Sequence, residues 1–198
     1  MQHIFTIVAG ILLFVGYVPY VLGMVRGSSH PTKASWIIWA SLDGITVAGM
    51  LAKHALNGQI TGALAGSGIV ALFAFRYGVP GWSRLDLFCL LGGMVGLFLW
   101  WLTTDATFAI VLSMTVTFLG SIPTFVSAYK NPHYENRTAW TFFFVSCLFA
   151  LPAIPAWTLA DALQPINFTI TETIMMYLLY VQPSLFGRRM LRSPMSRR

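Results

Sequence analysis

Long apolar runs separated by short polar gaps occupy almost the whole chain. A helix needs roughly 20 apolar residues to cross a bilayer, and by this measure the sequence predicts seven spans. These lie at 4–25, 35–55, 58–77, 84–102, 106–128, 139–160 and 166–187. The stretch 35–78 is too long for one span, and Asn57-Gly58 supplies a turn near its middle. The pattern therefore predicts an all-α integral membrane protein with seven transmembrane helices.

The basic residues lie in the gaps between these runs and provide a test of the span count. With the N-terminus outside, 11 of the 12 Lys and Arg residues lie on the inner side, and only Lys53 lies outside. Cytoplasmic loops carry an excess of Lys and Arg, and an error of one span would scramble the alternation. We therefore expect an outside N-terminus and a cytoplasmic C-terminus. The short loops and tails favour a bacterial inner membrane.

The composition excludes several other classes of protein. Charged residues make up 9% of the chain, whereas a soluble domain carries about 25%. The net charge of +6 does not come from a basic patch with interleaved aromatics, so we expect the lipid bilayer as a partner and no nucleic acid. The four histidines lie at predicted helix ends or in loops, which predicts no haem or metal and hence no cofactor. Without a phosphate loop or a nucleophile motif, no enzyme activity is expected.

The first and last parts of the chain repeat at an offset of 104 residues. The recurring residues are Phe14, Gly16, Pro19 and Trp36, which return as Phe118, Gly120, Pro123 and Trp140. A three-helix unit reverses the chain, so two such units need one extra span to point the same way. The repeat predicts two parallel three-helix units, 1–78 and 105–187, joined by a linker helix at 79–104 and followed by a basic cytoplasmic tail at 188–198.

This arrangement resembles the PQ-loop superfamily, and within it the SWEET-type transporters with their 3 + 1 + 3 helices. The resemblance rests on Gly16-Tyr17-Val18-Pro19 with Trp36 downstream, and on Gly120-Ser121-Ile122-Pro123 with Trp140 downstream. It implies that Pro19 and Pro123 act as hinges of an inner gate, with Gly16 and Gly120 one turn earlier. A static kink at each proline is the alternative. Related proteins with this plan carry sugars, amino acids or vitamins, or retrieve cargo as receptors.

Two carboxylates lie inside predicted spans, where an ionisable residue is by default a functional hypothesis. Asp43 is eight residues into the second span and Glu172 is six residues into the last, with no Lys or Arg at comparable depth. Three roles stay open for each: proton coupling, pairing with a cationic substrate, or a neutral carboxyl that holds the bundle together. Position 43 matches Cys147 and position 172 matches Gly68, so neither carboxylate is duplicated.

Further polar and aromatic residues in these spans could contact a substrate. The candidates are Trp39, Ser146, Asn167 and Tyr177. In the resembled family an Asn pair contacts the sugar, but here Asn167 matches Ala63. Trp36 and Trp140 lie near the inner ends of their spans, so anchoring at the lipid head groups is preferred for them over ligand contact.

Together these features predict a transporter of a small solute that works by alternating access. A sugar, an amino acid or a vitamin is open as the substrate, and proton coupling is open as the energy source. The alternative is a receptor, or an accessory or scaffold subunit of a membrane complex, with the same fold. Self-association into a homo-oligomer is left open.

Overall fold

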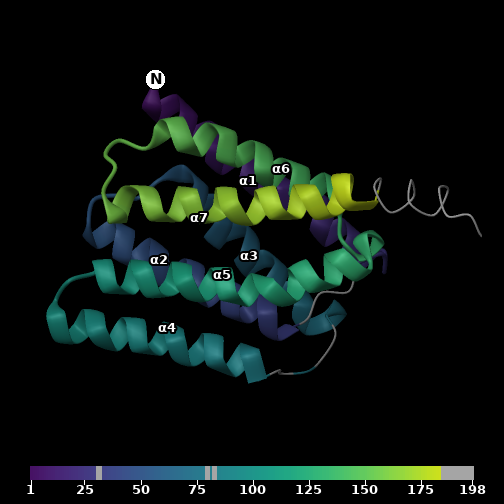
Figure 1. Cartoon of the computed structure of the whole chain (residues 1–198), viewed down its shortest axis with the longest axis horizontal. Helices are drawn as coiled ribbons and strands as arrows, with labels where there is room; N and C mark the ends of the chain where they lie inside the picture. Colours follow the sequence, from purple (N-terminus) through teal and green to yellow (C-terminus); the bar gives the residue numbers. More distant parts are fainter. Residues whose placement is uncertain (30–32, 79–80, 82–83, 184–198) are drawn as a thin grey trace, which may run out of the picture.

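A computed structural model describes residues 1–29, 33–78, 81 and 84–183 of the chain. Its helices run roughly along the long axis of the molecule (Figure 1). They are α1 (Gln2–Val25), α2 (Lys33–Ala52), α3 (Gly58–Tyr77), α4 (Arg84–Thr103), α5 (Thr107–Lys130), α6 (Arg137–Ala150) and α7 (Leu159–Met176). Short 3₁₀ turns η1 (Pro132–Tyr134) and η2 (Leu151–Ala153) and a π-helical turn η3 (Tyr177–Val181) complete the described elements. The described part of the chain has no strand, which confirms the all-α class.

Three of the helices, α1, α3 and α5, are long and apolar enough to cross a membrane. Shorter apolar helical stretches lie at Trp36–Ala52, Met94–Thr103 and Arg137–Ala153. With few charged residues and many large apolar side chains on its outside, the protein has the character of a helical membrane protein.

Six of the helices pack into a closed ring. Helix α1 packs against α3 and α6, α2 packs against α3 and α5, and α7 packs against α5 and α6. The order around the ring is therefore α1, α3, α2, α5, α7, α6. Helix α4 lies outside this ring at one edge of the molecule, against α5 and α2 (Figure 1).

The predicted boundary between the sixth and seventh spans is wrong. Helix α6 ends at Ala150, ten residues before the predicted end, because Pro152 lies in the next turn and cannot continue an α-helix. Helix α7 begins at Leu159, where the Thr158 side chain accepts a hydrogen bond from the Asp161 N–H. The predicted gap from Asp161 to Pro165 therefore lies within α7. The end of the last predicted span and the basic tail lie outside the described residues.

Helices α1 and α3 approach each other backbone to backbone. The N–H of Gly58 donates to the Thr6 hydroxyl at 2.7 Å. A Cβ on Gly62 would lie 2.5 Å from the Gly10 carbonyl oxygen. Small residues permit this kind of contact between helices in a membrane, and the contact fixes how α1 closes the ring.

Candidate functional site

A cavity of about 70 Å³ lies inside the ring and is lined by residues from all six ring helices. Its polar lining consists of Asp43, Ser67, Thr117, Ser121, Thr171 and Glu172. Its apolar and aromatic lining consists of Leu13, Tyr17, Trp36, Trp39, Trp140, Phe143 and Phe168. Because one water needs roughly 10–15 Å³ by this measure, the cavity has room for several waters or a small solute group.

Both predicted carboxylates line this cavity and are almost completely buried. Asp43 is 4% exposed, and the Ser67 hydroxyl donates to its Oδ2 at 2.8 Å. Glu172 is 7% exposed, and its Oε2 has no hydrogen-bond partner among the described residues. Neither Lys, Arg nor His contributes to the described lining. The described lining is therefore rich in acceptors and has no protein cation.

Asp43 lies near the middle of α2, and Glu172 lies near the middle of the continuous helical stretch 159–181 that α7 and η3 form. Asp43 is ten residues beyond the start of α2, or about 15 Å along it at 1.5 Å per residue. Glu172 is thirteen residues beyond the start of α7, or about 20 Å along it. The predicted depth of six residues for Glu172 is wrong, because the helix begins earlier than the apolar pattern indicated.

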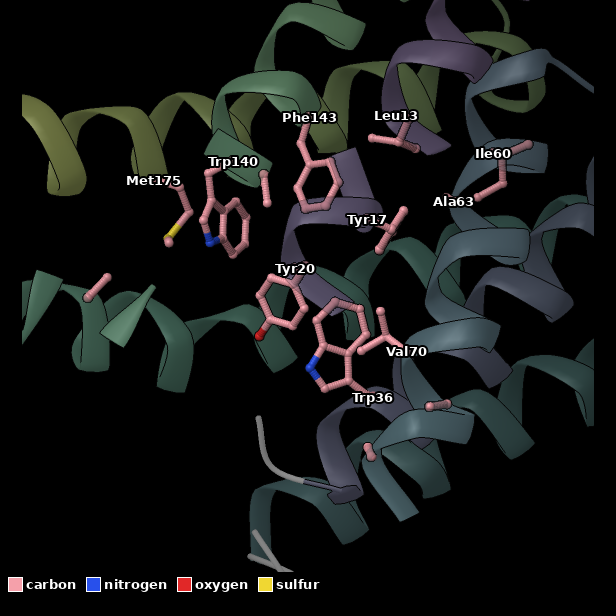
Figure 2. Packing of buried hydrophobic residues seen from close by; sticks show 14 of the residues in the cluster. Leu13, Tyr17, Tyr20, Trp36, Ile60, Ala63, Val70, Trp140, Phe143 and Met175 are labelled. Atoms are coloured by element: carbon pink, nitrogen blue, oxygen red, sulfur yellow. The ribbon is translucent and has the colours of Figure 1, made fainter. Parts of the chain in front are cut away.

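An aromatic cluster joins three helices around the cavity. Tyr17 of α1 lies between Phe143 of α6 and Trp36 of α2, with ring centroids 4.7 and 6.0 Å away. Trp36 in turn lies 5.0 Å from Trp39 and Phe143 lies 5.7 Å from Trp140. Figure 2 shows Tyr17, Trp36, Trp140 and Phe143 facing the same interior region.

The predicted interface role of Trp36 and Trp140 is wrong. The two side chains are only 5% and 6% exposed, and both line the cavity. Each lies on the first turn of its helix, where the apolar pattern placed it at head-group level. Tyr17 and Tyr20 of α1 pack against Trp36, and Phe143 packs against Trp140. These contacts could not be inferred from position along the sequence.

The other predicted contact residues have different positions. Trp39 lines the cavity, as expected for a contact residue. Ser146 is completely buried but is not among the lining residues. Asn167 donates from Nδ2 to the Met114 carbonyl at 3.0 Å, which joins α7 to α5. Tyr177 is 50% exposed and is not among the lining residues. The structure therefore brings Asp43, Glu172 and Trp39 together but not Ser146, Asn167 or Tyr177.

A buried polar network that sequence reasoning missed joins α3, α6 and α7. Gln59 Nε2 donates to the Ser146 hydroxyl at 2.9 Å and to Cys147 Sγ at 3.3 Å. Gln164 Nε2 donates to Gln59 Oε1 at 3.1 Å, and Asn57 Nδ2 donates to Gln164 Oε1 at 2.9 Å. Both glutamines are completely buried. The only signal in the sequence was a glutamine beside each predicted turn, where exposure is the ordinary expectation.

The predicted hinge in α1 lies at a close contact between helices. Pro19 is inside α1, and its carbonyl accepts a hydrogen bond from Asn136 Nδ2 at 2.9 Å. A Cβ on Gly16 would lie 2.7 Å from the Phe143 ring. The part of α1 around Gly16 and Pro19 is therefore held against α6 and its N-cap residue, Asn136.

The second predicted hinge lies within α5. Gly120 is half-buried there, one turn before Pro123, whose side chain lies outside the described residues. The motion proposed for either hinge stays a prediction.

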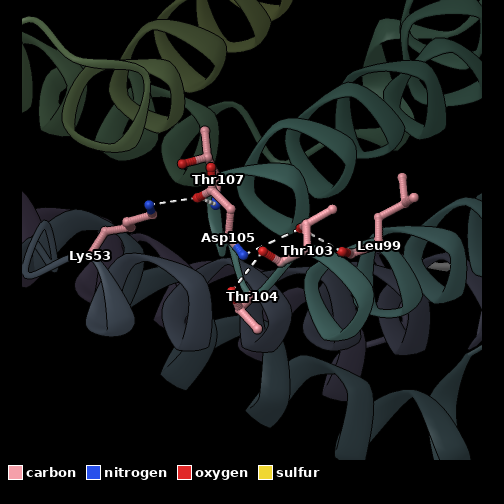
Figure 3. Close-up of polar contacts among 6 residues, drawn as sticks. All are labelled: Lys53, Leu99, Thr103, Thr104, Asp105 and Thr107. Carbon is pink, nitrogen blue, oxygen red and sulfur yellow. Dashed lines mark hydrogen bonds and ion pairs between the residues drawn. The ribbon is translucent and has the colours of Figure 1, made fainter.

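Two carboxylates outside the spans have ordinary structural partners. At one end, Lys53 Nζ pairs with Asp105 Oδ1 at 2.5 Å, and Asp105 also accepts from the Thr107 N–H (Figure 3). The Lys53 hydrogen bond lowers the pKa of Asp105 to about 2. At the start of α6, burial raises the pKa of Glu135 to about 7, although the Trp140 indole N–H donates to its Oε2 at 2.9 Å.

Most of the cavity lining falls into pairs separated by 104 residues. Five pairs account for ten of the thirteen lining residues: Leu13 and Thr117, Tyr17 and Ser121, Trp36 and Trp140, Trp39 and Phe143, and Ser67 and Thr171. Asp43, Glu172 and Phe168 have no lining partner at this offset. The carboxylates therefore make the cavity chemically asymmetric.

No protein-family model, curated protein or solved structure matches the chain. The function is therefore inferred from the cavity and its residues.

Proposed function

We propose that this protein is a small-solute transporter that works by alternating access, with its binding site in the ring cavity. The observation that carries the proposal is a cavity between all six ring helices that contains two buried carboxylates, Asp43 and Glu172. Intramembrane carboxylates are costly and mark substrate or proton pathways. Transporters built from repeats place their sites near the midplane, at the interface between the repeats.

Two features support seven spans arranged as two parallel units, 1–78 and 105–187, with the linker helix 79–104 between them. Exchanging α1 with α5, α2 with α6 and α3 with α7 leaves the order around the ring unchanged. The five lining pairs at an offset of 104 residues are the second feature. Under this proposal, the helix outside the ring, α4, is the linker.

The positions of the basic residues support an outside N-terminus. Lys33 at the start of α2 donates to the Phe75 carbonyl near the end of α3 at 2.9 Å. Arg137 at the start of α6 lies over the Tyr180 ring beyond the end of α7, 5.4 Å from its centroid. These helix ends share one side of the bundle, which is cytoplasmic by the positive-inside rule.

In this proposal the two ends of the cavity open in turn. The Gln59–Gln164 network joins the helix ends on the outer side and would have to separate when that side opens. On the inner side, Pro19 would let α1 bend away from the start of α6. Pro123 would let α5 bend away from the start of α2 in the same way. Asp43 and Glu172 would bind the solute, a coupled proton, or both.

The small cavity favours one second candidate, a receptor or scaffold subunit of the same fold. Its volume of about 70 Å³ is less than the roughly 300–1,000 Å³ of most small-molecule sites. A transporter in a closed state would have a small cavity that expands when one end opens. A scaffold would keep the interior closed.

Uptake into proteoliposomes separates these candidates. A thermal-shift screen of sugars, amino acids, vitamins and small amines first selects solutes that raise the unfolding temperature, because a ligand of the folded state stabilises it. Transport of a selected solute should then fall at least about tenfold in Asp43→Asn or Glu172→Gln, the effect of losing about 1.4 kcal/mol of interaction. Asp161→Asn, at the start of α7 and outside the cavity lining, is the control. Absence of uptake for every stabilising solute would favour the scaffold.

A further inference from the structure

The ring cavity combines acidic groups with aromatic faces in a way that suits one class of ligand. The six aromatic side chains in its lining are Tyr17, Trp36, Trp39, Trp140, Phe143 and Phe168. They come from α1, α2, α6 and α7, so rings surround the cavity from both halves of the chain. Ring faces attract cations through their quadrupole, and tryptophan does so most strongly.

The charged groups in the cavity also favour a cationic ligand. Asp43 comes from one half of the chain and Glu172 from the other, and no described lining residue carries a positive charge. A buried carboxylate is costly unless a proton or a cation neutralises it. Ser67 satisfies one Asp43 oxygen, but Glu172 Oε2 is buried without a partner among the described residues. The lining thus offers acceptors for a positive group from two sides.

Two hydroxyls add to this acceptor character. Thr117 Oγ1 and Thr171 Oγ1 are buried, line the cavity and have no hydrogen-bond partner among the described residues. A hydroxyl oxygen can accept from an ammonium or guanidinium N–H. A neutral polyol such as a sugar would instead require a partner for each of its hydroxyls, and most of the lining is aromatic or apolar.

We propose that the cavity binds a small organic cation, an ammonium or guanidinium group held between the aromatic rings and neutralised by Asp43 and Glu172. This deepens the proposed transport function and rests on the same cavity. Trp36, Trp39 and Tyr17 supply faces for the cation, and the two carboxylates supply the charge. The small volume limits the bound group to a compact head, such as a methylated ammonium.

Equilibrium binding to the purified full-length protein in detergent tests this directly. Choline is compared with 3,3-dimethylbutan-1-ol, its uncharged carbon analogue, and guanidinium is compared with urea. Titration calorimetry should give each cation an affinity at least about tenfold higher than that of its neutral analogue. Choline has no N–H, so its gain comes from cation–π attraction and from the carboxylate charge, whereas guanidinium also donates charge-assisted hydrogen bonds. Equal affinity within each pair, or no binding of either cation, would overturn the proposal.

Variants test which residues hold the cation. Asp43→Asn and Glu172→Gln keep the shape of the side chain but remove the negative charge that neutralises the cation, so each should weaken choline binding at least about tenfold. Trp39→Leu should weaken it about 2- to 30-fold, the range of a cation–π contact. Trp101→Leu is the control, because Trp101 is 74% exposed and does not line the cavity. Thermal unfolding checks that each variant is folded, and unchanged choline affinity in both carboxylate variants would overturn the proposal.

Uptake by liposomes distinguishes failure of this inference from failure of the proposed function. If choline binds as described but is not taken up, the cation site stands and transport is wrong. If a neutral solute is taken up while neither cation binds, transport stands and the cation site is wrong.

Discussion

Glu135 is a partly buried carboxyl just before α6, and its environment makes the stability of the protein depend on pH. Burial raises its pKa to about 7 in the folded protein, and the hydrogen bond from Trp140 opposes the shift only in part. The folded state therefore favours the protonated form. Above the unfolded pKa of about 4.3, the free energy of unfolding falls as the pH rises, until it levels off above pH 7.

Glu135→Gln should remove this dependence. The substitution should raise the free energy of unfolding by about 2 kcal/mol more at pH 8 than at pH 5, because one pKa unit corresponds to about 1.4 kcal/mol. Thermal unfolding in detergent at the two pH values measures this. An equal effect at pH 5 and pH 8 would show that the carboxyl titrates as it does in the unfolded chain.

Asp105 provides the opposite case and a control. Its pKa is lowered to about 2 by the hydrogen bond with Lys53 and by those with Thr107, so its stabilising effect is complete above pH 4 and is lost only as the pH falls through 2. Asp105→Asn should therefore lower the unfolding temperature equally at pH 5 and pH 8. A difference between these two pH values would contradict the lowered pKa of Asp105.

At the scale of the helices, glycine positions decide how closely α1 and α3 pack. Gly62 faces the backbone of α1, where a Cβ would lie 2.5 Å from the Gly10 carbonyl oxygen. On the same helix, a Cβ on Gly68 would meet nothing within 4 Å. Alanine should therefore destabilise the protein at Gly62 but not at Gly68.

Gly62→Ala should destabilise the protein by about 1–3 kcal/mol, the usual cost of overpacking. Gly68→Ala should be neutral or stabilising by up to about 1 kcal/mol, because alanine favours a helix over glycine. Unfolding of both variants in parallel checks the prediction. Equal stability of the two variants would mean that α1 and α3 can separate without cost.

The helices show what an apolar pattern can predict. The first five predicted spans agree with α1 to α5 within three residues at each end. The pattern failed between α6 and α7 for two reasons. Apolar residues continue past Pro152, where α6 has already ended, and the polar segment 161–165, which was predicted to be the gap between two spans, is part of α7. The ends of a predicted span depend only on where the apolar residues stop, whereas the ends of a helix depend on prolines and on capping residues such as Thr158.

At the scale of the whole molecule, the Gln59–Gln164 network links helices from both predicted units. Gln164→Leu would leave the buried Gln59 Oε1 without its partner, at a cost of about 1–3 kcal/mol, and would also remove the hydrogen bond from the half-buried Asn57. Gln59→Leu would have a similar effect. The double variant should lose less stability than the sum of the two single variants, because apolar groups then replace both partners. Additive losses in unfolding experiments would contradict the coupling.

The proposed topology predicts which ends of the helices face the outside of the cell. In a background without native cysteines, Lys53→Cys should react with a membrane-impermeant thiol reagent on intact cells. Arg76→Cys should react only after the membrane is permeabilised. Both positions are exposed at opposite ends of helices, so equal labelling on intact cells would exclude an outside N-terminus with seven spans.

The sequence by itself determined the helical membrane class, most helix bounds and the candidate status of Asp43, Glu172 and Trp39. These follow from hydropathy and from the cost of a carboxylate among apolar residues, and both quantities are local. Only the tertiary structure decided that Trp36, Trp140, Phe143 and Tyr17 face one cavity, that Gln59 and Gln164 meet, and that Tyr177 does not reach the site. The reason is that burial depends on which helix faces each neighbour around the ring. In a membrane, apolar residues on every face of a helix leave that rotation undetermined.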